Sequence, residues 1–300
     1  MSPRRPRRRR NGRHVPARRP RQRRRGRRTQ DAELPDHARK RQQPDRRSAQ
    51  SRTAGDRRVT TGTWRFSALE FALLWQLAGR EELPYPLQFR PDVSTRDDYT
   101  RQRLAAAAAI RPQLDRMLHR ALFALASPEV SVEVCGFAGV DQDRKIRMHA
   151  GIQRDIGAVA VQEPGRDHDR GGDVLLSLCG SRTMASRIVE SLPPVSAGNR
   201  RGLSIHTRDL EPSTAVLRST RGRSASDDLD AFLDSRRTCI GHIAVRTAET
   251  TRDFHWMDFD NDGRYLTRGG EMLTAKPVSA SDMTTELQRL ISRGPICPTW

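Results

Sequence analysis

An abrupt change in composition at residue 58 divides the chain into two parts that cannot belong to one fold. Residues 1–58 carry 23 Lys and Arg against five Asp and Glu, a net charge of +18, and contain no Phe, Trp or Tyr. Like charges at this density repel one another and almost nothing apolar is available for burial, so this segment is predicted to be disordered. The whole chain has 55 basic and 36 acidic residues, which leaves 32 and 31 for residues 59–300. That part is nearly neutral and long enough to bury a large core.

Three interpretations of the basic segment stay open. As an arm that binds nucleic acid or an anionic membrane, its arginines would gain affinity from phosphates without sequence specificity. As a solvated linker it would have no partner. As a mis-called start it would not be translated, because no Met lies between Met1 and Met117, and Val59 directly precedes the first folded signal. A valine codon can serve as a start in GC-rich bacteria.

Several protein classes are excluded by simple patterns. No run of 18 apolar residues is present, so no transmembrane helix is predicted, and no apolar segment follows the basic start as a signal peptide requires. The four cysteines, Cys135, Cys179, Cys239 and Cys297, include no C-x-x-C pair, which fits neither a disulfide scaffold nor a zinc site. A cytoplasmic location is therefore expected.

The first folded element is predicted to be a helix that begins after Ser67. Ser67 and Glu70 have the spacing of a capping box, and Phe66 and Phe71 have that of a hydrophobic staple. Gly79 offers the helix a stop. Residues 96–110 favour a second helix, and Pro112 fits the first turn of a third, whose apolar stripe begins at Leu114.

From Val130 the apolar period changes to two, which predicts strands. The predicted strands of the first half lie at 130–135, 145–150, 156–161 and 173–178, with a turn region at 162–172 and a helix from Ser181 to Glu190. The second half is predicted to contain a strand at 202–206, a helical region at 209–234, a meander at 239–246, 253–259, 263–268 and 271–276, and a helix at 281–292. Both halves, about 59–195 and 196–300, thus run from helices to antiparallel strands to a helix, which indicates a pseudo-duplicated α+β fold.

Two motifs contain residue types that bind metals or act as nucleophiles. Residues 258–263 match the first six positions of an EF-hand loop, but the twelfth is Gly269 rather than an acid, so a hairpin turn with solvated carboxylates is preferred to a calcium site. Cys179 precedes a predicted helix start and is an alternative candidate nucleophile, against the commoner role of a buried cysteine. Phosphate-loop, dinucleotide, nucleophile-elbow and zinc-protease motifs are absent from the sequence. Neither a catalytic residue nor a cofactor or metal is expected.

Two blocks at opposite ends of residues 59–300 resemble one family. The first is FSALEFALLWQLAG at 66–79 with ELPYPL at 82–87; the second is WMD at 256–258 with DGRYL at 262–266 and LTAKP at 273–277. Between them, LPP at 192–194 and LSI at 203–205 also fit. In this order and spacing they resemble the EspG family of ESX (type VII) secretion-associated proteins of actinobacteria, over about residues 62–292.

The resemblance implies a function and a fold. It implies a cytosolic chaperone, not an enzyme, that binds secreted PE–PPE helical heterodimers, covers an aggregation-prone tip of the PPE partner and delivers the pair to the secretion machinery. It also implies a central antiparallel sheet flanked by two helical bundles with quasi-twofold symmetry. No specific nucleic acid and no membrane insertion are expected, and the oligomeric state is left open. The alternative function is nucleic-acid binding through residues 1–58.

The resemblance also suggests a partner-binding site. Family members engage substrate through a loop between early strands and through C-terminal helical surface. By position alone, that loop corresponds to Gly139, Val140, Asp141, Gln142, Asp143 and Arg144, at the tip of a predicted hairpin. A simple exposed turn is the alternative. Trp75, Trp256 and Tyr265 are expected to be core or turn anchors rather than contact residues.

Overall fold

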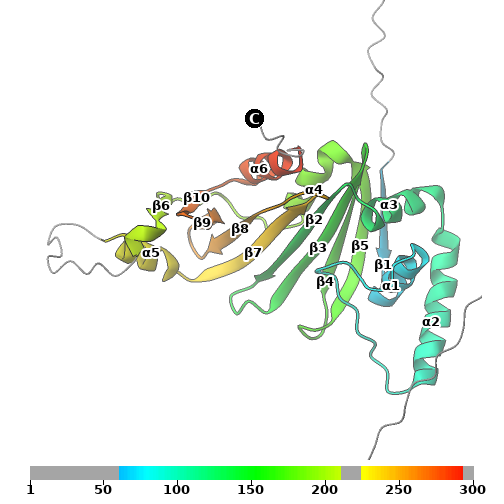
Figure 1. The fold of residues 1–300 in the computed structure, drawn as a ribbon. Coiled ribbons are helices and arrows are strands. Elements are labelled where there is room, and N and C mark those ends of the chain that lie inside the picture. The colour runs from blue at the N-terminus through cyan, green and yellow to red at the C-terminus, as the bar shows by residue number, and fades with distance from the viewer. Residues whose placement is uncertain (1–60, 211–223, 293–300) are drawn as a thin grey trace, which may run out of the picture. The chain divides into compact units, whose positions relative to one another are not determined.

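The strands of the described residues join into one antiparallel sheet of ten strands, with helices packed on both of its faces (Figure 1). The computed structural model describes residues 61–210 and 224–292. The predicted α+β class is confirmed. The strands are β1 (Gly62–Phe66), β2 (Val130–Ala138), β3 (Arg144–Gln153), β4 (Ile156–Pro164), β5 (Gly171–Gly180), β6 (Leu203–His206), β7 (Arg237–Arg246), β8 (Thr251–Phe259), β9 (Gly263–Arg268) and β10 (Met272–Pro277). The α-helices are α1 (Ala68–Leu77), α2 (Arg96–Ile110), α3 (Arg116–Ala126), α4 (Met184–Glu190), α5 (Ala225–Leu233) and α6 (Ala280–Ser292), with 3₁₀ turns η1 (Arg111–Gln113), η2 (Ser181–Thr183) and η3 (Thr207–Leu210).

The strand order is β1-β5-β4-β3-β2-β7-β8-β9-β10-β6. Each half contributes a four-stranded meander, β2–β5 or β7–β10, and one earlier strand that pairs with the meander's last strand. Read from the sheet edge inwards, the two halves therefore have the same order. They join through β2 and β7, where Gly136 lies opposite Gly241.

Side chains alternate between the two faces of the sheet. Paired residues on neighbouring strands form rows on one face, and the helices that pack against a row therefore cover that face. The row Val159, Ala150, Val132 and Val245 packs with α4 and α6 in one core cluster, and we call this side the α4–α6 face. Ala158 and Ala160 belong to the opposite side, where they pack with α1 and α3, and we call this side the α1–α3 face. Helix α2 packs on α1.

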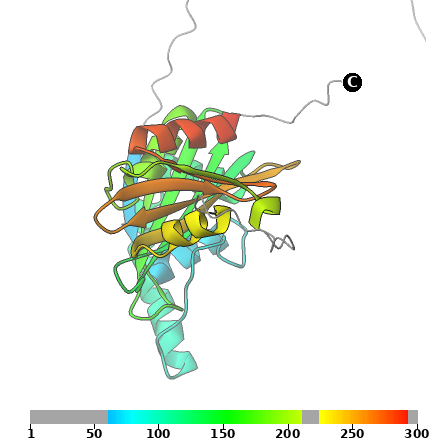
Figure 2. The same ribbon diagram turned by 90° about the vertical axis from the view of Figure 1, so that its left-hand side faces the viewer.

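Helix α5 covers the α1–α3 face at the other end of the sheet. Its Phe232 packs edge-to-face against Phe259 and Tyr265, with ring centroids 5.0 and 5.2 Å away. Figure 2 looks from the α5 end of the sheet and shows α6 above the orange strands and α5 below them. Between α3 and α5, the middle of the α1–α3 face has no helix over it among the described residues.

The predicted helix start at Ser67 is confirmed in detail. The Ser67 hydroxyl accepts from the Glu70 N–H at 3.3 Å, and the Ser67 N–H donates to Glu70 Oε2 at 2.7 Å. Phe66 and Phe71 are both fully buried. The expectation that this helix is the first folded element is wrong, because β1 precedes it and pairs with β5 about a hundred residues later.

The predicted third helix is present as α3, with Leu118, Ala121, Leu122 and Leu125 buried, but its predicted start at Pro112 is wrong. Pro112 lies in the 3₁₀ turn η1, and α3 begins only at Arg116 because Asp115 is its N-cap, with its carboxylate accepting from the Leu118 N–H at 2.7 Å. Leu114 is extended and half exposed instead of starting the buried stripe.

Several strands are longer than predicted, among them β2, which ends at Ala138, and β3, which ends at Gln153. Strands β4 and β5 extend into the predicted turn region 162–172, which leaves residues 165–170 as the turn. Of the helical region predicted at 209–234, the structure describes η3 and α5, and residues 211–223 lie outside it.

Candidate functional site

The uncovered middle of the α1–α3 face forms a strip three strands wide. The pairing register aligns its side chains in four rows across β2, β7 and β8: Phe137–Ile240–Met257, Cys135–His242–His255, Glu133–Ala244–Asp253 and Ser131–Arg246–Thr251. We call these residues the open strip. All of them except the small Ala244 are partly or fully exposed.

The open strip is bounded on both sides by covered strands. On the β3 side, the segment after α1 lies over Arg147 and His149, and the Tyr85 hydroxyl reaches Cys135 Sγ at 3.1 Å. On the β9 side, α5 covers Tyr265. The strip is therefore a shallow surface with raised edges.

One end of the open strip is apolar. Phe137 is 38% exposed, Tyr85 60% and Val140 48%. Phe137 lies beside the partly exposed Ile240 in the row next to the hairpin, and exposed apolar neighbours of this kind are typical of binding surfaces.

The predicted partner-binding residues lie at this apolar end, at the tip of the β2–β3 hairpin, as expected. Gly139, Val140, Asp141, Gln142 and Asp143 form the turn and Arg144 begins β3. Gly139 and Gln142 have φ values of 98° and 54°, and Gln142 N–H donates to the Gly139 carbonyl. The role of these six residues in binding stays a prediction.

The other end of the open strip is charged. Arg246 donates to Glu133 at 2.9 Å, and His242 Nε2 lies 2.9 Å from Asp253 Oδ2. The rings of His242 and His255 are 4.5 Å apart. Partial burial, followed by the neighbouring His242, lowers the pKa of His255, so this imidazole is neutral at pH 7.

A buried arginine ties the β4–β5 turn to the segment after α1. The Arg147 guanidinium is 3% exposed and donates to Gln88 Oε1 at 2.8 Å and to the His168 carbonyl at 2.5 Å. Burial lowers its pKa. These bonds hold the β4–β5 turn next to the β2–β3 turn. The two turns together line a polar pocket.

The cysteines Cys179 and Cys239 are buried in the core of the protein. Cys179 is buried, and burial raises the pKa of its thiol, the reverse of what an activated nucleophile needs. Burial and the carboxylate of Asp258 raise the pKa of Cys239 to about 11. In the described ranges, no three His, Cys, Asp or Glu side chains are grouped as a metal site would need. Among the described helices, none has the length and apolar character to cross a bilayer.

Of the three carboxylates in the EF-hand-like turn, Asp260 is exposed as expected, whereas Asp258 and Asp262 are not solvated. Asp258 is fully buried and forms a two-bond ion pair with Arg264, at 2.7 and 2.8 Å. Asp262 pairs with Arg200 at 2.5 Å and also accepts from the Tyr265 hydroxyl at 3.2 Å. These two carboxylates face guanidinium groups, so they stabilise the turn and the sheet.

The tryptophans and the tyrosine of the family-like blocks are core residues, as expected. Trp75 is 4% exposed, and Trp256 and Tyr265 are 0% exposed. Trp75 Nε1 donates to the Glu82 carbonyl at 2.6 Å, which joins the two parts of the first block. These three aromatic residues therefore build the fold, whereas Phe137 and Ile240 of the open strip lie outside the family-like blocks.

The fold and its surfaces define an α+β protein built on a ten-stranded antiparallel sheet, with an uncovered strip on one face. The chain belongs to the EspG family, whose family model matches residues 67–289. Family membership makes it a type VII secretion-associated protein. No curated protein gives a significant match to the chain.

Buried His149 predicts that stability falls in mild acid. Burial lowers the pKa of His149, against smaller opposing effects of the Leu125 and Tyr85 carbonyls and of Glu133. The unfolded chain takes up a proton near the ordinary pKa of about 6.5, while the folded chain does not. The free energy of unfolding should therefore decrease as the pH falls below about 6.5.

This dependence is measured by urea unfolding at a series of pH values. His149→Gln should be less stable than the wild type at pH 8 and should lose less stability between pH 7.5 and 5.5. If His149→Gln lost as much stability between pH 7.5 and 5.5 as the wild type, the pH dependence would come from other groups, such as His255.

Proposed function

We propose that this EspG-family protein is a cytosolic chaperone of type VII secretion. It binds a PE–PPE-type secreted heterodimer, keeps it soluble and delivers it to the secretion machinery. The observation that carries the proposal is the open strip, an uncovered sheet face with an apolar end at the β2–β3 hairpin. No cofactor and no catalytic step is needed for such a function.

The dimensions of the open strip suit a helical partner. Neighbouring strands lie about 4.8 Å apart, so β2 and β8 are about 10 Å apart, close to the diameter of one α-helix. A partner's apolar helical tip needs an apolar patch with a polar rim. Phe137 and Ile240 provide the patch, and the Glu133–Arg246 pair provides part of the rim.

We assign the predicted loop, Gly139 to Arg144, to one edge of this contact. Val140 is its exposed apolar side chain. The resemblance also implied C-terminal helical surface, but the outward side of α6 is polar, with Ser281, Asp282 and Thr285 exposed. The apolar part of the contact is therefore assigned to the open strip.

The architecture proposed with this function is a domain of residues 59–300 whose halves are related by a pseudo-twofold rotation through the β2–β7 pair. The equal strand orders of the halves support it. So does the packing of α4 and α6, which follow equivalent strands, on the same face. The two flanking helical groups would be α1–α3 with α5 on one face and α4 with α6 on the other.

The test is co-expression of the tagged full chain with each PE–PPE-like pair of the same genome, followed by pull-down and size-exclusion chromatography. A stable one-to-one complex with one pair is expected. Phe137→Glu and Ile240→Glu should weaken it by about 2 kcal/mol or more, about thirtyfold in Kd, because each places a charge in the apolar patch.

Leu175→Glu is the matched control, because Leu175 is 39% exposed, as Phe137 is, but lies on β5 away from the strip. It should leave binding unchanged. Equal losses from Phe137→Glu and Leu175→Glu would remove the open strip as the binding surface. No complex with any pair from a folded protein would contradict the chaperone function, and nucleic-acid binding through residues 1–58 would then be tested by its salt dependence.

A further inference from the structure

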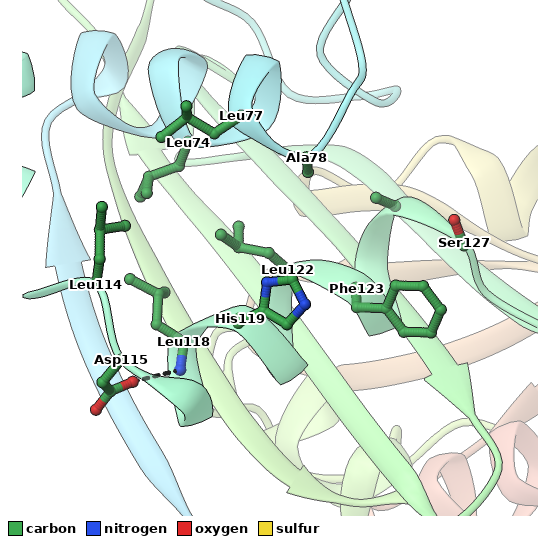
Figure 3. A pocket seen from close by; sticks show the side chains of 11 residues that line it. Leu74, Leu77, Ala78, Leu114, Asp115, Leu118, His119, Leu122, Phe123 and Ser127 are labelled. Atoms are coloured by element: carbon green, nitrogen blue, oxygen red, sulfur yellow. Dashed lines mark hydrogen bonds between the residues drawn. The ribbon is translucent and has the colours of Figure 1, made fainter.

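A second apolar surface lies apart from the open strip, in a groove between α1 and α3 (Figure 3). The groove has a volume of 520 Å³. Three of its side chains are large, apolar and exposed: Leu77 at 66%, Leu114 at 51% and Phe123 at 49%. Such a cluster indicates a surface that another molecule covers.

The groove exists because the two helices bury the sides that face the sheet and stay apart above it. Leu74, Leu118 and Leu122 form its floor (Figure 3). Leu114 closes one end, because the chain is extended between η1 and α3. At the other end Arg80 reaches the Ala126 carbonyl, which fixes the turn after α1 against the last turn of α3.

The length of the groove matches about three turns of helix. Helix α1 has 10 residues and α3 has 11, so each wall is about 15 Å long. An amphipathic helix that lies in such a groove uses apolar residues at i, i+3, i+4 and i+7.

The α3 wall is positively charged. Arg116 and Arg120 lie one turn apart beside the lip formed by His119 and Phe123, and α3 contains no acidic residue. In the described part of the chain, neither arginine has a carboxylate within ion-pair distance. Asp115, the acidic residue that lines the groove, is engaged as the N-cap of α3.

We propose that the α1–α3 groove binds an amphipathic helix of a protein partner whose flank facing α3 is acidic. The site is separate from the open strip, so the proposal goes beyond the secretion-substrate contact. The positive charge of the α3 wall favours an acidic helix over two other occupants, residues 1–58 and a second copy of the chain. Residues 1–58 would bring a net charge of +18 and no aromatic side chain to an apolar groove that Arg116 and Arg120 flank.

A second copy of the chain is the other occupant that charge disfavours. The exposed apolar side chain that a second copy could offer from α2 is Leu104, which is 67% exposed. Arg101 is paired with Asp98, whereas Arg111, two turns from Leu104, is in none of the ion pairs of the described residues. Docking α2 into the groove would therefore place Arg111 against the arginines of α3.

The test uses the full chain and two labelled helical peptides. Both carry leucines at i, i+3, i+4 and i+7; one has glutamates and the other lysines on one flank. Fluorescence anisotropy should show at least about tenfold tighter binding of the glutamate peptide, with a preference that shrinks at high salt. Leu77→Glu should weaken this binding at least about tenfold, and the double variant Arg116→Glu, Arg120→Glu should reverse the preference.

Leu104→Glu is the matched control, because Leu104 and Leu77 are equally exposed and only Leu77 lines the groove. It should bind the glutamate peptide like the wild type. Equal binding of the two peptides, or equal losses from Leu77→Glu and Leu104→Glu, would overturn the proposal.

Three further results would reassign the groove and overturn the proposal. The first is a dimer in solution that Leu77→Glu dissociates. The second is tighter peptide binding after deletion of residues 1–58, which would mean that this segment occupies the groove. The third is loss of the PE–PPE complex in Leu77→Glu, which would make the groove part of the contact with the secretion substrate. If Leu77→Glu keeps the PE–PPE complex, the groove and the open strip are separate binding sites, and the failure of one proposal would not imply the failure of the other.

Discussion

Replacement of Asp258 by Asn should lower the free energy of unfolding by about 3–5 kcal/mol. Asp258 and Arg264 are 0% and 1% exposed and share two hydrogen bonds in the core between the sheet and α6. The variant keeps the volume of the side chain and removes its charge. The Arg264 guanidinium then keeps two neutral acceptors, the amide oxygen of the new side chain and the Pro193 carbonyl, but has no carboxylate to balance its buried charge.

The measurement is urea unfolding followed by tryptophan fluorescence. Asp260→Asn is the matched control, because Asp260 lies in the same turn and is exposed, and it should change stability by less than about 0.5 kcal/mol. The double variant Asp258→Leu, Arg264→Met should be more stable than Asp258→Asn, because it removes the unpaired charge as well as the pair.

A loss of less than about 1 kcal/mol in Asp258→Asn would show that the guanidinium finds water or another acceptor. The turn would then not depend on the ion pair. Equal losses in Asp258→Asn and Asp260→Asn would contradict the distinction between a buried and a solvated carboxylate.

Local signals in the sequence are enough to predict most of the helices and strands. The Ser67–Glu70 capping box depends on residues three apart, and the alternation in β2 depends on next neighbours. The strand β1 was not predicted, because its five residues become a strand by pairing with β5, about a hundred positions away. Non-local pairing of this kind leaves no local pattern.

The same reasoning explains what could be predicted of the candidate site. The hairpin tip at Gly139–Arg144 follows from two neighbouring strands and was found. The open strip was not, because Cys135 meets His242 only through the β2–β7 register, which joins segments a hundred residues apart. The groove was missed because Leu114 was assigned to the buried stripe of α3.

The family-like motifs and the proposed contact surfaces overlap in part. Trp75, Asp258 and Tyr265 are buried and hold the sheet and its turns. Phe137 and Ile240 of the open strip lie outside the motifs, whereas Leu77 of the groove is an exposed residue of the first block. The buried motif residues therefore specify the fold and leave the apolar patch of the open strip unspecified. This is why family membership reaches type VII secretion without naming a partner.

Replacement of Gly241 by Ala should destabilise the protein by about 3 kcal/mol, at the upper end of the range for overpacked cores. Gly241 and Gly136 face each other where the two halves of the sheet join, and the Trp256 indole lies against both. A Cβ at Gly241 would lie 2.0 Å from Cη2 and 2.4 Å from Cζ2 of that indole. Trp256 is fully buried, so its ring cannot move without displacing α6 or the neighbouring strands.

The matched control is Gly269→Ala, because Gly269 has no heavy atom within 4 Å of an added Cβ and needs no positive φ. That variant should change stability by less than about 0.5 kcal/mol. Trp256→Leu alone should cost about 3 kcal/mol through the cavity that it leaves. The double variant Gly241→Ala, Trp256→Leu should cost less than the two single variants together, because the new methyl group occupies part of that cavity. Additive losses would mean that Trp256 does not pack against Gly241, and that the two halves of the sheet are joined by backbone pairing alone.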